Sequence, residues 1–93
     1  MSGTARYSLV VADQYKRVLK KLCRKNPALV LEIERAVGKI LYYPEFGKPL
    51  RHSLRNYRRV HIEGSFVLLY ETQGTVVRLI DFDHHNQIYK KYS

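Results

Sequence analysis

The segment GKPLRHSLRNYRRVHI, residues 47–62, carries cationic side chains at a density that favours phosphate binding. It contains five lysines and arginines, two histidines and no carboxylate. Arginine binds phosphate through two parallel hydrogen bonds, and lysine binds it as a point charge. Aromatic side chains that could stack on unpaired bases lie among or near these cations, at Tyr57, Phe66, Tyr89 and Tyr92. The pattern indicates a nucleic-acid surface, and it does not separate DNA from RNA.

Several side chains in and around this segment could also cleave RNA without a metal ion. Such cleavage needs a base for the 2′-hydroxyl proton, cations for the phosphorane charge, and an acid for the leaving 5′-oxygen. A histidine suits either proton-transfer role, because the reference pKa of its side chain is about 6.5. The candidates are His61, His84 and His85, with Glu45 as an alternative base and Tyr89 as an alternative acid. For each of them, a solvated surface residue is the simpler interpretation.

The run DFDHH, residues 81–85, raises the alternative of a metal site. Asp81, Asp83 and His85 would share one face of an extended strand, and their oxygen and nitrogen atoms suit several transition metals. The sequence has no second cluster at a recognisable spacing, and neighbouring arginines would repel a cation. We therefore expect no metal and no other cofactor. Cys23, in the middle of a predicted helix, is expected to be a small core residue.

Length and charge limit the classes of protein that remain. A chain of 93 residues is expected to form one domain, residues 1–93. Its net charge of +9 favours an anionic partner, such as nucleic acid, an acidic protein segment or a membrane surface, although solubility alone is the simpler explanation. The sequence has one cysteine, no run of about 18 apolar residues, and no signal sequence. These features favour the reducing cytoplasm and no membrane partner.

The hydrophobic period predicts an α+β domain that would position these side chains. A strand near residues 7–11 is followed by two helices, capped by Asp13 and Asn26, the second ending near Tyr43 because Pro44 follows. The period then changes to two and predicts a three-stranded antiparallel meander, with strands at residues 57–63, 66–71 and 76–82. The order β-α-α-β-β-β gives one twisted sheet with both helices on one face.

The same period assigns faces to the first meander strand. If Val60 and Ile62 face the helices, then Tyr57, Arg59 and His61 face away from them, and an open sheet surface becomes the candidate site. The alternative assignment buries Tyr57, Arg59 and His61 against the helices and exposes Arg58. It is less favourable, because burying Arg59 without a partner would be costly.

Three segments of the chain, in this order, resemble the RelE/ParE superfamily of toxin–antitoxin toxins, and most of all its RelE and YoeB branches. They are YSLVVADQYKRVLKKL, KPLRHSLRNYRRVHIEGSFVLLYE and DHHNQIY, and together they span nearly the whole chain. The resemblance implies a RelE-like fold and a small basic toxin that a RelB-like antitoxin neutralises. It also implies that the toxin enters the ribosomal A site and cleaves the mRNA there without a metal ion.

The resemblance also implies roles for individual residues. The family's basic pair on the first meander strand falls on Arg58 and Val60 without a gap, or on Arg59 and His61 if the turn is one residue shorter. The late tyrosine of RelE proteins matches Tyr89. The candidate catalytic residues are Arg59, His61, His84, His85, Tyr89 and Glu45. The candidate RNA-binding residues are Lys48, Arg51, Arg55, Tyr57, Arg58 and Arg78.

The chain departs from the family pattern at two places. Val67 stands where most members have a strand arginine that contacts the scissile phosphate, and His84–His85 replaces a histidine–arginine pair. Losing one such contact costs about 3–4 kcal/mol of transition-state stabilisation, or about 10²–10³ in rate. Either Arg58, Arg59 or Arg78 substitutes from a neighbouring strand, or the toxin is weak or inactive.

Three hypotheses follow. The first is a ribosome-dependent endoribonuclease that inhibits translation. The second is a ParE-like toxin that binds DNA gyrase, which the missing arginine favours and the histidine-rich tail does not. The third is a degenerate, non-catalytic member that still captures an antitoxin or RNA.

Overall fold

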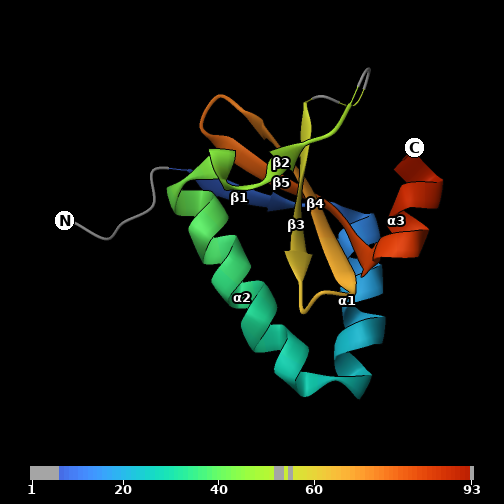
Figure 1. Ribbon diagram of the computed structural model, residues 1–93. Coiled ribbons are helices and arrows are strands. Elements are labelled where there is room, and N and C mark those ends of the chain that lie inside the picture. Colours follow the sequence, from blue (N-terminus) through green and yellow to red (C-terminus); the bar gives the residue numbers. More distant parts are fainter. Residues whose placement is uncertain (1–6, 52–53, 55, 93) are drawn as a thin grey trace.

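The computed structural model describes residues 7–51, 54 and 56–92 (Figure 1). Along the chain its elements are β1 (Ser8–Val11), α1 (Asp13–Lys25), α2 (Pro27–Tyr42), the short 3₁₀ helix η1 (Pro44–Phe46), β2 (Lys48–Pro49), β3 (Tyr57–Ile62), β4 (Phe66–Gln73), β5 (Val76–His84) and α3 (His85–Tyr92). The α+β class and the order of strand, two helices and meander are confirmed. Three elements were not expected, the short helix η1, the short edge strand β2 and the helix α3.

The five strands form one sheet in the order β1-β5-β4-β3-β2. Strand β1 runs parallel to β5, and the other neighbours are antiparallel. A parallel pair needs a long connection, and here it runs through α1 and α2 and then through the strands β2, β3 and β4. The sheet therefore joins the first strand of the chain to the last.

Helices α1 and α2 cover one face of the sheet and form the main core with it. The buried side chains of this core include Tyr15 from α1, Ile33 and Ile40 from α2, and Leu68 and Tyr70 from β4. Helix α2 ends where the sequence predicts, because Pro44 follows the capping Tyr43.

The predicted helix caps need correction. Ala12, not Asp13, occupies the N-cap position of α1, and Asp13 lies in the first turn, where a carboxylate interacts favourably with the helix dipole. Asn26 does occupy the N-cap position of α2, but its side chain makes no capping hydrogen bond.

A β-bulge in β5 decides which of its side chains enter the core. Leu69 pairs with Asp81 and Tyr70 pairs with Leu79, so that Ile80 is the extra residue. Without a bulge, Leu79 and Asp81 would point to the same face. The bulge lets both Leu79 and Phe82 join the main core and turns Asp81 to the opposite face.

Helix α3 covers part of the sheet face that was expected to be open. Val67 and Leu69 point away from α1 and α2, yet both are completely buried, as is Ile88 of α3. Figure 1 shows α3 beside β4 and β5. The expectation of a fully open face was wrong because β4 is apolar on both faces, and its second face also needs cover. No helix in the described part of the chain is long and apolar enough to cross a membrane.

Candidate functional site

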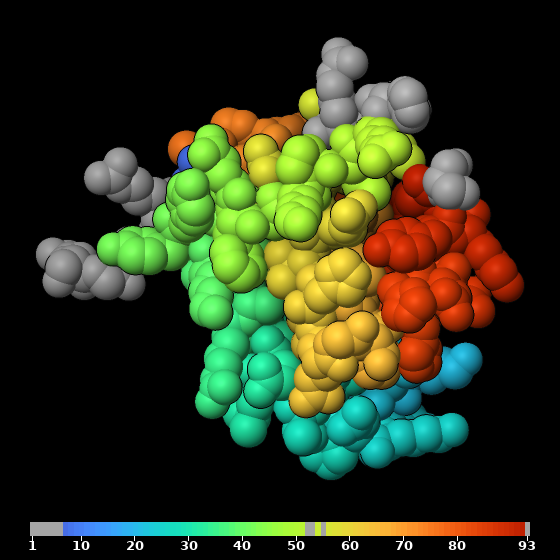
Figure 2. Space-filling model, in the orientation of Figure 1, coloured from blue at the N-terminus to red at the C-terminus, as the bar shows by residue number. Residues whose placement is uncertain are grey.

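The side chains of β3 alternate between the two faces of the sheet. Ile62 is buried in the main core and Val60 packs against it, which confirms the predicted assignment of faces. Tyr57, Arg59 and His61 therefore point to the face that carries α3, and His61 is exposed. In Figure 2 the surface of β3 (yellow) adjoins that of α3 (red).

Arg59 has an unused hydrogen-bond donor on this face. Its Nε is buried and has no hydrogen-bond partner among the residues that the structure describes. The ion pairs found in that part of the chain do not include Arg59 either. Lys48 of β2 lies opposite Arg59 in register and is exposed. The two cationic side chains thus belong to the same face, at the edge of the sheet away from β5.

Arg58 points to the other face of the sheet and binds the backbone of the loop between α2 and β2. Its Nη1 donates hydrogen bonds to the carbonyl oxygen of Gly47, at 2.6 Å, and to that of Glu45, at 3.4 Å. The two neighbouring arginines of β3 therefore lie on opposite sides of the sheet. The structure does not bring Arg58 together with Arg59, although both were expected to contact RNA.

Tyr70 fixes the same loop from within the core. Its hydroxyl donates to the carbonyl oxygen of Pro44 at 2.6 Å and accepts from the Gly47 N–H at 2.8 Å. Burial raises the pKa of this phenol, so it stays a donor. A Cβ on Gly47 would lie 2.8 Å from both the Tyr70 hydroxyl and the Arg59 carbonyl oxygen, so only glycine fits here. Glu45 is exposed on this anchored loop.

Helix α3 is attached to the sheet through Asp81, which is completely buried. Oδ2 of Asp81 accepts hydrogen bonds from the Tyr92 hydroxyl, at 3.0 Å, and from Nζ of Lys91, at 3.2 Å. Lys91 also lies 3.5 Å from Oδ2 of Asp83. The Tyr92 ring packs edge-on against Tyr57 of β3, with 6.3 Å between centroids. This cluster links α3, β5 and β3.

The two adjacent histidines diverge. The ring of His84 lies against Phe66, with centroids 4.5 Å apart, and this places His84 on the face of α1 and α2. His85 begins α3, and its ring lies 6.0 Å from that of Tyr89 on the next turn. Of the two, His85 is therefore the one that shares an element with Tyr89 on the face of Arg59 and His61.

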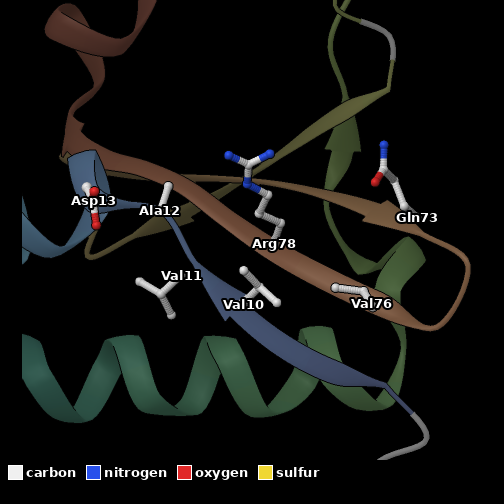
Figure 3. A pocket seen from close by; sticks show the side chains of 7 residues that line it. All are labelled: Val10, Val11, Ala12, Asp13, Gln73, Val76 and Arg78. Atoms are coloured by element: carbon white, nitrogen blue, oxygen red, sulfur yellow. The ribbon is translucent and has the colours of Figure 1, made fainter.

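The remaining predicted residues are spread more widely. Arg78 shares the face of Arg59, and its half-exposed guanidinium lies 3.6 Å from the carboxylate of Glu71. Figure 3 shows Arg78 pointing to the side of β1 and β5 that faces away from α2. Arg78 is one of the residues that line a hollow of about 440 Å³ there. Arg51 is exposed beyond β2. Arg55 lies outside the described residues.

The described residues also limit other chemistry at this face. They contain no group of three or more His, Cys, Asp or Glu side chains placed to hold a metal ion. In the DFDHH run, the oxygen of Asp81 that faces α3 contacts Lys91 and Tyr92 instead. Val67, at the place of the family arginine, lies between His61 and Asp83 in register and is completely buried.

Sequence reasoning missed the residues that hold the site together. Asp81 was considered only as a metal ligand, and Tyr70, Gly47 and Lys91 were given no role. One signal was available, the uninterrupted apolar run FVLLY, which is typical of a strand covered on both faces. A strand of this kind needs a further element to cover its second apolar face. The residues after β5 had not been assigned to an element and could do so.

A groove of about 670 Å³ runs along the opposite side, between α1, α2 and β1. Its lining is mainly apolar and includes Leu9, Val30 and Val37, with Lys16 and Lys20 on the side of α1 and Glu34 on the side of α2. Cys23 also lines this groove, and burial raises the pKa of its thiol.

Known proteins resemble this chain in both sequence and structure. A family model described as the ParE toxin of the type II toxin-antitoxin system, parDE, matches residues 5–89. A protein of Methanocaldococcus jannaschii named as a candidate toxin, RelE4, is 36% identical over 88 residues, which cover 91% of this chain and 93% of the relative.

Two solved structures extend the comparison. The toxin–antitoxin complex RelBE2 of Mycobacterium tuberculosis contains a chain that superposes with a TM-score of 0.68 at 29% identity, over 88% of this chain and 94% of that one. The YoeB/ParE toxin of Agrobacterium tumefaciens gives a TM-score of 0.77 at 17% identity, over 84% and 98% of the two chains. The second likeness bears on the fold alone.

Proposed function

Because this chain belongs to the ParE toxin family of type II toxin–antitoxin systems, within the RelE/ParE superfamily, we propose that it cleaves messenger RNA in the ribosomal A site without a metal ion. The observation that carries the proposal is Arg59, whose guanidinium has no carboxylate partner among the described residues and whose Nε is buried without a hydrogen bond. Burial closes the Nε atom itself to a ligand, so a phosphate would be held by the terminal Nη groups of this partly exposed guanidinium, whose charge it would neutralise.

The proposed reaction is an internal transfer within RNA. His61 takes the proton from the 2′-hydroxyl, whose oxygen attacks the phosphorus, and the bond from phosphorus to the 5′-oxygen breaks. His85 or Tyr89, which are neighbours on α3, returns a proton to the leaving 5′-oxygen. Arg59 and Lys48 stabilise the negative charge that develops on the phosphorane. Glu45 is the alternative base, carried by the anchored loop.

Mapping of mRNA ends in a purified translation reaction tests this proposal. The Arg59→Ala variant should lower the cleavage rate about 10²–10³-fold, because one charge-stabilising contact is lost. Arg35→Ala is the matched control, since Arg35 is exposed on α2 and, among the residues that the structure describes, forms an ion pair only with Glu32 one turn away. Intact message at every A-site codon in the presence of the unmodified toxin would overturn the proposal.

A second candidate function is a toxin that binds DNA gyrase and cuts no RNA. Val67 favours it, since the face of Arg59 has an apolar, completely buried side chain where the family arginine would stand. Inhibition of gyrase supercoiling by the purified protein, together with intact message in the translation reaction, would establish this alternative.

An antitoxin is the proposed protein partner, as in the RelBE2 complex. The groove between α1, α2 and β1 suits an amphipathic segment with acidic residues, because its lining is mainly apolar and its two lysines, Lys16 and Lys20, outnumber its one carboxylate, Glu34. β1 is also an edge of the sheet and can accept a further strand. Such a partner would keep the toxin inactive in the cytoplasm until it is removed.

One pair of variants tests the groove. Val30 lines it, whereas its exposed neighbour Leu31 does not. Val30→Glu should weaken the complex with the antitoxin encoded by the adjacent reading frame, since it adds a carboxylate against an acidic segment. Leu31→Glu should leave the affinity unchanged. Equal effects of the two substitutions would place the antitoxin elsewhere.

A further inference from the structure

Three aromatic side chains stand exposed within five residues at the end of α2. Tyr42, Tyr43 and Phe46 have exposed fractions of 69%, 59% and 41%. Burying an aromatic ring is strongly favourable, so a small domain usually places its rings in the core. Several exposed rings together, beside a charged surface, indicate a binding role.

The backbone that carries these rings is held firmly. The Tyr43 N–H donates to the Lys39 carbonyl oxygen at 2.8 Å, and the Phe46 N–H donates to the Tyr43 carbonyl oxygen at 2.9 Å. Tyr70 and Arg58 bind the other polar groups of the loop from the sheet. Rings on an anchored loop lose little conformational freedom when a ligand binds, which favours affinity.

Cations flank the rings on both sides. The Lys39 ammonium lies 5.5 Å from the centroid of Phe46, and exposed Lys48 follows the loop in β2. Between residues 39 and 51 the sequence has three basic residues and a single carboxylate, that of Glu45. Exposed rings between cations suit a ligand that alternates flat bases with phosphates, which is single-stranded nucleic acid.

The loop that carries the rings adjoins the candidate site at the β2 edge of the sheet. Figure 2 shows the surface of η1 and β2 (light green), then β3 (yellow), then α3 (red), on one face of the molecule. Lys48 forms the junction, because it follows η1 closely and lies opposite Arg59 in register. Arg58 and Tyr70 hold the loop from the opposite face, so a single-stranded RNA running from the rings to Arg59 would pass over this edge of the sheet at Lys48.

We propose that Tyr42, Tyr43 and Phe46 form a platform on which unpaired bases of single-stranded RNA stack, while Lys39 and Lys48 hold the adjacent phosphates. This inference rests on the proposed function, since it extends the path of the RNA that the site would cleave. The platform reads no sequence, because every base has a flat face.

The experiment compares a short single-stranded RNA with a ribose-phosphate chain of equal length that lacks bases, by fluorescence anisotropy at several salt concentrations. The unmodified protein should bind the RNA about 5- to 150-fold more tightly than the abasic chain. Y42A/Y43A should lose most of this preference and keep the salt dependence, whereas Y42F/Y43F should retain both. K39A/K48A should reduce the slope of log affinity against log salt by about 1.4 and keep the preference for bases.

Each outcome separates the platform from the proposed cleavage. A base preference in a protein that leaves message intact would support the platform and overturn the endoribonuclease. Equal binding of the two chains would overturn the platform, whatever the cleavage assay gives. A Y42A/Y43A variant that keeps its base preference but loses antitoxin affinity would also overturn it, and would assign these rings to the protein partner.

Discussion

The hydroxyl of Tyr92 donates a hydrogen bond to Oδ2 of Asp81, 3.0 Å away at the junction of α3 and β5. Asp81 is completely buried, and Lys91 supplies the second side-chain donor to the same oxygen. The helix that carries His85 and Tyr89 is thus attached to the sheet by a charged acceptor under its last turn. Its position relative to β3 depends on this contact.

Removing the Tyr92 hydroxyl should therefore destabilise the protein. Tyr92→Phe is expected to lower the free energy of unfolding by about 1.5–3 kcal/mol, because it leaves a buried carboxylate with one donor fewer. Tyr42→Phe is the control, since Tyr42 is mostly exposed and should change stability by less than about 0.5 kcal/mol. Urea denaturation measures both values, and equal stabilities of the two variants would contradict the assignment.

Stability should fall at alkaline pH. Burial raises the pKa of Tyr15 to about 12, and burial together with the hydrogen bond and charge of Asp81 raises the pKa of Tyr92 above its ordinary value of 10.0. The unfolded chain then releases these protons first, so the stabilisation is complete below about pH 10 and is lost as pH rises through the folded-state values. Unfolding free energies between about pH 8 and pH 11 should fall less steeply for Tyr92→Phe. Parallel curves would count against this coupling.

Gly47 should not tolerate a side chain. Its Cβ would meet the Tyr70 hydroxyl and the Arg59 carbonyl oxygen at 2.8 Å, and the latter cannot move without disturbing β3. Gly47→Ala is expected to cost about 1–3 kcal/mol of stability. Gly38→Ala, with open space around its Cβ in the middle of α2, should instead raise stability by about 0.5–1 kcal/mol. Thermal unfolding of the two variants provides the comparison.

The adjacent arginines of β3 should differ in function. Arg59→Ala is expected to leave stability nearly unchanged and to reduce the slope of log affinity against log salt for single-stranded RNA by about 0.7. Arg58→Ala should do the reverse, costing about 1–3 kcal/mol because two loop carbonyls lose their donor. RNA titrations at several salt concentrations, with parallel denaturation, distinguish the two. Equal salt slopes would remove Arg59 from the RNA surface.

Restoring the family arginine on β4 should fail. Val67 is completely buried on the face that α3 covers, so Val67→Arg would place an unpaired charge there or displace α3. We expect a loss of several kcal/mol of stability and no gain in cleavage. Val67→Ile, which stays apolar, should cost less than about 1.5 kcal/mol. A stable and more active V67R variant would show that α3 leaves room for a cation.

Residue types and strand period were enough to predict how β3 presents its side chains. Val60 and Ile62 face the main core, and the alternating positions place Arg59 and His61 on the other face. The order of strand, two helices and meander was also predicted, because each element has its own period. These features depend on the spacing of apolar residues within single elements, which can be seen directly in the sequence.

The rest depends on contacts between distant segments. The bulge at Ile80 turns the side chain of Asp81 to the opposite face of the sheet, and no local sequence pattern around Ile80 predicts it. Arg58 was predicted to bind phosphate because the segment 47–62 contains no carboxylate that could pair with it. Its partners are instead carbonyl oxygens of residues more than ten positions earlier in the chain. Helix α3 was missed because its sequence is mostly polar, and Ile88 is its one buried side chain.

The parallel pairing of β1 with β5 determines when, during synthesis of the chain, the sheet can be completed. Residues 8–11 pair with residues 76–79, so the first strand to be synthesised cannot join the sheet until the last strand has been synthesised. A sheet closed by so distant a pair forms late, since the loop must close before the contact stabilises it. An incomplete nascent chain therefore lacks the finished sheet, and with it the arrangement of β3 and α3 that the proposed site requires.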